Sequence, residues 1–137
     1  MRIFFDSSAF AKRFIEESGS NDIEHICGRA SSLGLSIICV PEVISAFNRR
    51  QRENTLNRIQ YQQAKRHLLE DVRDADIINL TVPVIGSSIR ILENGNIRAM
   101  DALHVACAID WNADLFVSAD KRQLTAAKKE GLKTKKV

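Results

Sequence analysis

The sequence contains no apolar run approaching the roughly 20 residues that a membrane-spanning helix needs. Its first residues include one arginine and reach Asp6 almost at once, without the long apolar core and cleavage site of a signal peptide. We therefore expect neither a transmembrane helix nor a signal peptide, no membrane partner, and a cytoplasmic location.

Cysteine is scarce, and several well-known motifs are missing. Cys27, Cys39 and Cys107 are odd in number, lack CxxC spacing and stand among apolar residues, which favours buried free thiols in a reducing cytoplasm over disulfides or zinc ligands. There is no G-x-x-x-x-G-K-[ST] phosphate loop, no G-x-G-x-x-G motif and no G-x-S-x-G nucleophile elbow. These absences disfavour a P-loop NTPase, a dinucleotide-binding enzyme and a serine hydrolase.

The 137 residues suit one domain with a proper core, spanning residues 1–137. The net charge of +3 is mildly basic and is weak evidence for a nucleic-acid partner when taken alone. Basic side chains crowd two regions, residues 49–66 and residues 121–136. Either region could be a solvated helix face, which is the commoner case, or could follow a phosphate backbone.

Strand-like apolar runs alternate with helical patterns along the whole chain. The patterns predict strands at residues 2–5, 35–40, 77–80 and 115–117, and residues 132–137 could add an edge strand. They predict helices at residues 9–17, 22–33, 41–52, 58–74, 84–92, 101–110 and 121–130, with Gly34 ending the second. Such alternation is typical of an α/β domain in which helices cover both faces of a mainly parallel sheet of four or five strands.

Four carboxylates differ from the other acidic residues, which lie on polar helix faces or ends. Asp6 and Asp120 each follow an apolar strand. Glu42 begins the helix after the second strand, and Asp101 begins the most apolar helix. Taken singly, the three aspartates suit helix N-caps and Glu42 suits a first-turn acid. Because function gathers outside the carboxyl ends of parallel strands, the four could also converge at one sheet edge.

Carboxylates that converge repel one another and raise one another's pKa unless a cation holds them. Ligands that are all oxygen favour Mg²⁺ or Mn²⁺ over zinc. His104 follows Asp101 by one helical turn and could face the site, although a packed or hydrogen-bonded helix histidine is the commoner case. Ser7 and Ser118 lie close to two of the acids, so they could orient those carboxylates or serve as ordinary turn and cap residues.

With these residues the chain resembles the PIN-domain ribonucleases, and among them the VapC-type toxins of prokaryotic toxin–antitoxin modules. The resemblance covers essentially the whole chain. It rests on the strand that ends in Asp6-Ser7-Ser8, on Glu42, on Asp-Ala-Leu-His-x-Ala at residues 101–106, and on Leu-Phe-Val-Ser-Ala-Asp at residues 115–120. Ser118 stands where the family usually has threonine, and serine keeps the hydroxyl. The surroundings of Glu42 vary most in the family.

The resemblance implies a Rossmann-like PIN fold, a three-layer α/β/α arrangement, and a metal-dependent endoribonuclease. It implies that Mg²⁺ or Mn²⁺ is the cofactor. The residues that it assigns to metal binding and catalysis are Asp6, Glu42, Asp101 and Asp120, with Ser7 and Ser118 supporting them.

The partners that the resemblance implies are an RNA substrate, a cognate antitoxin laid over a groove, and a second copy of the chain in a homodimer. We expect the groove near helices that carry Phe10, Phe14, Phe47 and Tyr61, although these could be core residues, as we expect for Phe47. Aromatic residues make up 6% of the chain, so we expect recognition of RNA shape or of one loop rather than serial base stacking.

Two other classes of function stay open. A non-catalytic PIN-like module that binds RNA or protein is one, and an incomplete acidic set would favour it. A phosphatase or phosphotransferase with Asp6 as nucleophile is the other. Haloacid-dehalogenase-like enzymes have a second aspartate two residues on, where this chain has Ser8.

Overall fold

A computed structural model describes the whole chain, Met1–Val137. Five strands form its sheet: β1 (Arg2–Phe5), β2 (Ser32–Ser36), β3 (Asp76–Ile78), β4 (Leu115–Ser118) and β5 (Thr134–Lys136). Seven helices surround them: α1 (Ser7–Ala11), α2 (Ser20–Arg29), α3 (Cys39–Arg52), α4 (Arg58–Arg73), α5 (Val82–Glu93), α6 (Ala99–Asp110) and α7 (Lys121–Lys129). Each strand pair in the order β3-β2-β1-β4-β5 is parallel. The predicted α/β class is confirmed, and residues 134–136 supply the fifth strand.

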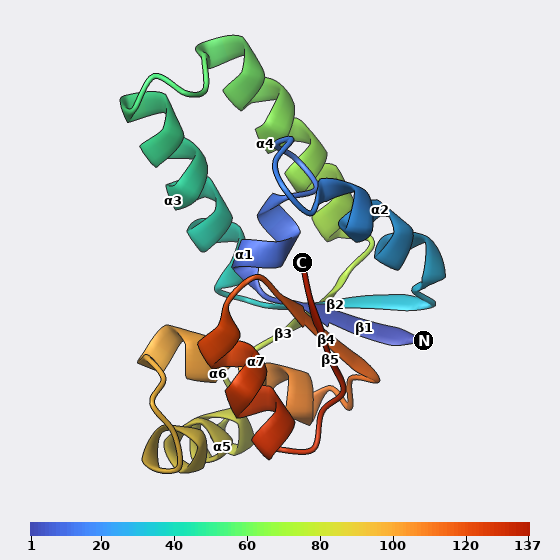
Figure 1. Ribbon diagram of the computed structural model, residues 1–137, viewed down its shortest axis with the longest axis vertical. Coiled ribbons are helices and arrows are strands. Elements are labelled where there is room, and N and C mark those ends of the chain that lie inside the picture. Colours follow the sequence, from blue (N-terminus) through green and yellow to red (C-terminus); the bar gives the residue numbers. More distant parts are fainter.

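Helices cover both faces of the sheet, as Figure 1 shows. Helices α1 to α4 pack on one face around a core that includes Ile3, Phe5 and Leu35. Helices α5 to α7 pack on the other face around Phe4 and Phe116. Successive side chains of β1 point to opposite faces, so this central strand anchors both layers. Burying one such side chain contributes about 1.5–3 kcal/mol. In none of the seven helices are length and apolar character sufficient for a membrane crossing.

Three elements near the amino terminus differ from their predicted ranges. Strand β2 ends at Ser36, and residues 37–40 form a turn and the start of α3 rather than strand. Helix α2 ends at Arg29, and Gly34 lies within β2, where the Trp111 ring packs 2.7 Å from the point that a Cβ would occupy. Helix α1 ends at Ala11, and the carbonyl of the next residue accepts the Ser20 hydroxyl from a neighbouring segment.

The strand order creates a switch point between β1 and β4. From β1 the chain goes to β2 and β3 on one side, and it later adds β4 and β5 on the other. In open α/β sheets, ligands bind outside the carboxyl ends of the strands at such a point. Asp6 follows β1 and Ser118 ends β4, so the fold brings these two predicted segments together.

Candidate active site

Asp6 is completely buried at the carboxyl end of β1, and it is the N-cap of α1. Its carboxylate accepts hydrogen bonds from the Ala9 backbone N–H at 2.9 Å and from the hydroxyls of Ser8 and Ser118 at 2.8 and 2.7 Å. Burial raises the pKa of Asp6, although these hydrogen bonds lower it. One side chain therefore holds both roles that the sequence left open, helix cap and candidate site residue.

Asp101 and Asp120 come from the other side of the switch point. Asp101 lies in the first turn of α6, after the N-cap Arg98, so the N-cap interpretation of Asp101 is wrong. Asp120 is the N-cap of α7, and its carboxylate accepts the Arg122 N–H at 2.8 Å. Helix starts thus place both carboxylates beside the end of β4.

Electrostatic repulsion connects the acids. Burial raises the pKa of Asp101, and the charge of Asp120 raises it further. The charges of Asp6 and Glu42 also raise the pKa of Asp101, and His104 opposes them. The structure therefore brings the four predicted carboxylates into one electrostatically coupled group, named here the acidic cluster: Asp6, Glu42, Asp101 and Asp120.

Glu42 is held by His104 and Ser7. Its Oε1 accepts the Ser7 hydroxyl at 2.7 Å and lies 2.5 Å from Nε2 of His104. Burial alone would raise the pKa of Glu42, but the hydrogen bonds from His104 and Ser7 lower it below its usual value. His104 is 1% exposed, so it is both a packed helix histidine and a residue of the site. Ser7 bonds Glu42 rather than its sequence neighbour Asp6.

Two residues of the site were not predicted from the sequence, Ser8 and Gln123. The Ser8 hydroxyl bonds Asp6, the role expected of Ser7. Gln123 is 4% exposed, and its Nε2 lies 2.7 Å from Oδ2 of Asp6. Helical spacing could have indicated Gln123, because it shares a buried face of α7 with Ala126 and Ala127.

The acidic cluster is the place where the family resemblance would put a divalent cation. No group of three or more His, Cys, Asp or Glu side chains stands in an arrangement that could hold an ion as it is. The chemistry of the cluster nevertheless fits Mg²⁺ or Mn²⁺, because its donors are carboxylate oxygens. Burial raises the pKa of both Asp6 and Asp101, and neighbouring carboxylates raise that of Asp101 further, so a cation would stabilise their ionised forms.

Two hollows with basic walls border the acidic cluster. One, of about 410 Å³, lies between α1 and α3 and includes Ser7, Ser8 and Glu42 in its lining. The other, of about 230 Å³, lies between α7 and the loop before α6. Their basic side chains are Lys12, Arg49 and Arg50 in the first, and Lys121, Arg122 and Lys129 in the second. Positive charge therefore lies in the hollow that Glu42 lines and in the hollow lined by Lys121 and Arg122, which follow Asp120 in the chain.

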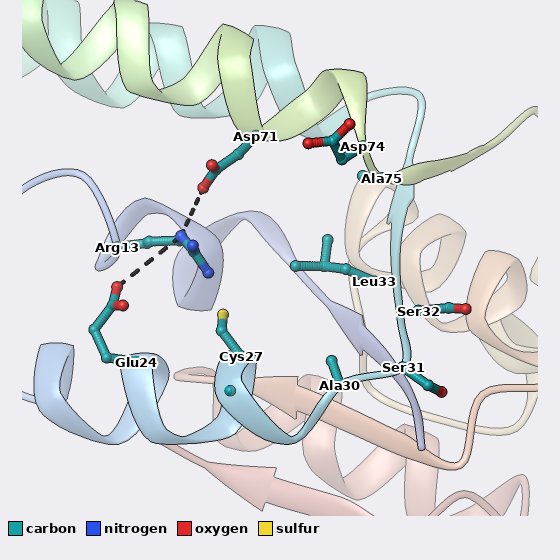
Figure 2. Close-up of a pocket in the computed structure, with 11 residues that line it drawn as sticks. Arg13, Glu24, Cys27, Ala30, Ser31, Ser32, Leu33, Asp71, Asp74 and Ala75 are labelled. Atoms are coloured by element: carbon teal, nitrogen blue, oxygen red, sulfur yellow. Dashed lines mark ion pairs between the residues drawn. The ribbon is translucent and has the colours of Figure 1, made fainter.

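A further hollow, of about 440 Å³, lies at the amino ends of β2 and β3, away from the acidic cluster (Figure 2). Arg13 points between two carboxylates there, with its Nε 2.6 Å from Asp71 and 4.0 Å from Glu24. Cys27 lies beside Arg13, and burial raises the pKa of its thiol. Arg13 pairs with both Glu24 and Asp71, and Asp74 at the edge is exposed, which indicates a structural role for the hollow.

The chain matches known proteins over most of its length. A family model described as PIN domain matches residues 3–129. A similar solved structure is PAE2754 from Pyrobaculum aerophilum, with 18% identity and a TM-score of 0.71, covering 98% of this chain and 89% of that chain.

Two further solved structures are similar to the chain. VapC20 from Mycobacterium tuberculosis, a sarcin-ricin loop cleaving toxin, has 14% identity and a TM-score of 0.70, over 90% of this chain and 94% of that chain. VapBC2 from Rickettsia felis, bound to a promoter DNA fragment, has 14% identity and a TM-score of 0.69, over 100% and 99%. No curated protein sequence matches the chain. The solved structures show that the fold is that of VapC toxins. Because the family model spans nearly the whole chain, this protein belongs to the PIN domain family.

Proposed function

We propose that this PIN protein is a Mg²⁺- or Mn²⁺-dependent endoribonuclease and the toxin of a VapBC-type toxin–antitoxin pair. The acidic cluster at the switch point carries the proposal. Four carboxylates from separate elements interact there, and two of them, Asp6 and Asp101, have raised pKa values. Acids with perturbed pKa values mark functional sites, because burying a carboxylate, and for Asp101 also placing it beside other carboxylates, costs stability that a purely structural role would not require. The likeness to VapC20 and VapBC2 supports the toxin assignment.

In this proposal Asp6, Asp101 and Asp120 hold the cation, and Glu42 completes the set. A bound Mg²⁺ or Mn²⁺ lowers the pKa of a coordinated water and neutralises charge on the scissile phosphate. Oε1 of Glu42 is occupied by Ser7 and His104, which leaves Oε2 free to accept a proton from the attacking water. The lowered pKa of Glu42 keeps it ionised, and therefore able to accept, at neutral pH.

The two basic hollows would recruit the RNA backbone, which the acidic cluster alone would repel. Lys12 and Arg50 pair with Glu17 at 3.1 and 2.6 Å. The other four cations of the hollows form no ion pair with an acidic residue, so their charge is available for phosphates. With few aromatic residues in the chain, recognition would depend on backbone shape and polar contacts.

The hollow between α1 and α3 is the proposed seat of the antitoxin. Its apolar lining consists of Ala11, Ile15, Val43, Ala46, Phe47 and Ala119. An apolar segment laid there would lie against the Ser7 and Glu42 side of the acidic cluster. Phe10 and Phe47 are buried core residues, and Phe14 and Tyr61 are half-buried against the same core. The four aromatic side chains therefore do not form an exposed apolar surface for the antitoxin.

The proposal extends to a homodimer and to a cytoplasmic location. An exposed apolar stripe on α5, made up of Val82, Ile85, Ile89 and Leu92, would form the homodimer contact. The three cysteines are free, and burial raises the pKa of the Cys39 thiol to about 12. Thiols that stay protonated and unpaired suit a reducing cytoplasm.

RNA cleavage by the purified protein tests the proposed activity. We expect cleavage in Mg²⁺ or Mn²⁺, its loss in EDTA, and a loss of at least about 100-fold in Asp6→Asn and Asp101→Asn, since each removes a cation ligand. Asp74→Asn, an exposed acid on the opposite edge, is the matched control and should cleave like the wild type. Undiminished cleavage in both site variants would contradict the proposal. Tight RNA binding without turnover in either metal would instead support the non-catalytic PIN-like module.

A further inference from the structure

Gln123 connects the two carboxylates of the acidic cluster that have raised pKa values. Its amide Nε2 lies 2.7 Å from Oδ2 of Asp6 and 3.1 Å from Oδ1 of Asp101. An amide NH₂ carries two protons, so one nitrogen can donate to both carboxylates at once. For the Asp101 carboxylate this is the only hydrogen bond in the structure.

The rest of the Gln123 side chain shows that its placement serves these two bonds. The residue is 4% exposed, and its Oε1 is buried without a hydrogen-bond partner. Burying an amide oxygen without a partner costs stability. The two bonds to carboxylates are charge-assisted and offset this cost. The positive end of the amide dipole therefore lies between two carboxylates that, in the proposed function, would both hold the cation.

We propose that Gln123 is a positioning residue that acts as an amide clip, bridging Asp6 and Asp101 in the metal-free protein and giving up that bridge when a divalent cation binds. The competition with metal rests on the proposed function. The bridge itself does not, because it stabilises the folded chain whether or not RNA is cleaved. Any contact that favours the metal-free state over the metal-bound state lowers the affinity for metal by the same factor.

Thermal unfolding of Gln123→Met in EDTA and in saturating Mn²⁺ tests the clip, because methionine keeps the length of the side chain but cannot donate. In EDTA we expect the melting temperature to fall by about 5–10 °C as two charge-assisted bonds are lost. In Mn²⁺ the difference from wild type should shrink to less than half. Calorimetric titration with Mn²⁺ should give a Kd about tenfold lower than that of wild type. Gln62→Met, at an exposed position of α4, is the control and should match wild type throughout.

A purely structural role for Gln123 predicts equal losses in EDTA and Mn²⁺, and that result would overturn the competition. A Kd for Mn²⁺ that rises in Gln123→Met would also overturn it, because the amide oxygen would then be a metal ligand. Unchanged stability in EDTA would overturn the clip itself. Absence of any Mn²⁺ response in both proteins would overturn the competition together with the metal site of the proposed function.

If Gln123→Met does not fold in EDTA, Gln123→Asn provides the second test. It keeps an amide donor, but its side chain is one methylene shorter and cannot reach both Asp6 and Asp101 as Gln123 does. We expect a smaller loss of stability in EDTA than for the methionine variant, and again a smaller difference from wild type in Mn²⁺. An asparagine variant as stable as wild type in EDTA would overturn the clip.

Discussion

Single residues of the acidic cluster combine a folding role with a candidate chemical one. Asp6 caps α1 and Asp120 caps α7, each through a backbone N–H that its carboxylate accepts. A cap is worth about 1 kcal/mol and also fixes the direction of the side chain. For these two acids the helix-cap interpretation and the functional interpretation are therefore compatible, because the start of the helix fixes the direction of the carboxylate.

The placement of Asp101 among other carboxylates should lower the stability of the folded protein. A carboxyl whose pKa is raised on folding holds its proton more tightly in the native state, so its contribution to stability is lost as the pH rises through that value. The ionised form of Asp101 is opposed by burial and then by Asp120, Asp6 and Glu42, whereas His104 favours it. Asp101→Asn removes both the buried charge and the repulsion. In EDTA at pH 7 we expect it to melt about 2–5 °C above wild type.

The sign of the Asp101 effect is checked by repeating the melts in EDTA at lower pH. As wild-type Asp101 takes up its proton, the repulsion fades there too, and the advantage of Asp101→Asn should shrink. Asp74→Asn, at an exposed position, serves as the control and should show no such advantage at any pH. An Asp101→Asn variant less stable than wild type at pH 7 would contradict the predicted repulsion.

At the same scale, the four acids were predictable from the sequence, whereas two of their supporting residues were not. Strand ends and helix starts are visible in a sequence, and they revealed Asp6, Glu42, Asp101 and Asp120. The Ser8 and Gln123 contacts depend on which turn and which helix face meet Asp6, and tertiary packing decides both. A polar residue in a basic helix is ordinarily taken as solvent-exposed, which is why Gln123 was missed.

For helices and strands, too, local sequence pattern predicts some features and tertiary packing decides others. The alternation of strands and helices is encoded locally and was predicted correctly. The range of β2 was not, because residues 35–40 form one apolar run although only the first two belong to the strand. What places β2 is its packing partner. The Trp111 ring lies on Gly34 and donates through Nε1 to Asp76 at 3.0 Å, a contact between distant segments that no local pattern reveals.

A matched pair of glycine substitutions tests this packing account of β2. Gly34→Ala should destabilise the protein by about 1–3 kcal/mol, because the new methyl group would meet the Trp111 ring at 2.7 Å. Gly28→Ala is the control. Gly28 lies within α2 with open space around its Cα, so alanine should stabilise by about 0.5–1 kcal/mol. Urea unfolding measures both, and equal effects of the two substitutions would contradict the account.

Across the whole molecule, charge is distributed according to the site rather than evenly. The basic regions of the sequence gave no indication of which cations face the cluster, because that depends on the sheet order. We predict that Lys121→Ala with Arg122→Ala weakens RNA binding and lowers the slope of log affinity against log salt by about 1–2. Arg29→Ala with Arg73→Ala, at exposed positions on other helices, is the control. Binding is measured in Ca²⁺ or with Asp6→Asn to prevent cleavage. Equal losses in both double variants would show that net charge, and not the position of Lys121 and Arg122, determines RNA binding.

The outer face of α5 provides the last prediction, which concerns assembly. The helix packs inward through Val84, Ser88 and Ile91, while Ile85 and Ile89 stay 41% and 51% exposed. Their neighbours on the same face of the helix, Val82 and Leu92, are exposed as well. An apolar stripe of this length is unusual on the surface of a monomer and indicates a protein contact. In a homodimer the stripe would pack against its own copy across a twofold axis, which buries the same residues on both chains.

Ile85→Asp with Ile89→Asp would place two buried charges in that contact on each chain. We expect light scattering after size exclusion to show a dimer for wild type and a monomer for this variant, with a dissociation constant raised at least about 100-fold. Ile59→Asp, at a 71% exposed position of α4, is the matched control and should remain dimeric. Because α5 lies on the sheet face opposite α1 and α3 (Figure 1), the monomeric variant should keep the hollow proposed for the antitoxin. A variant that stays dimeric would show that the contact lies elsewhere on the surface.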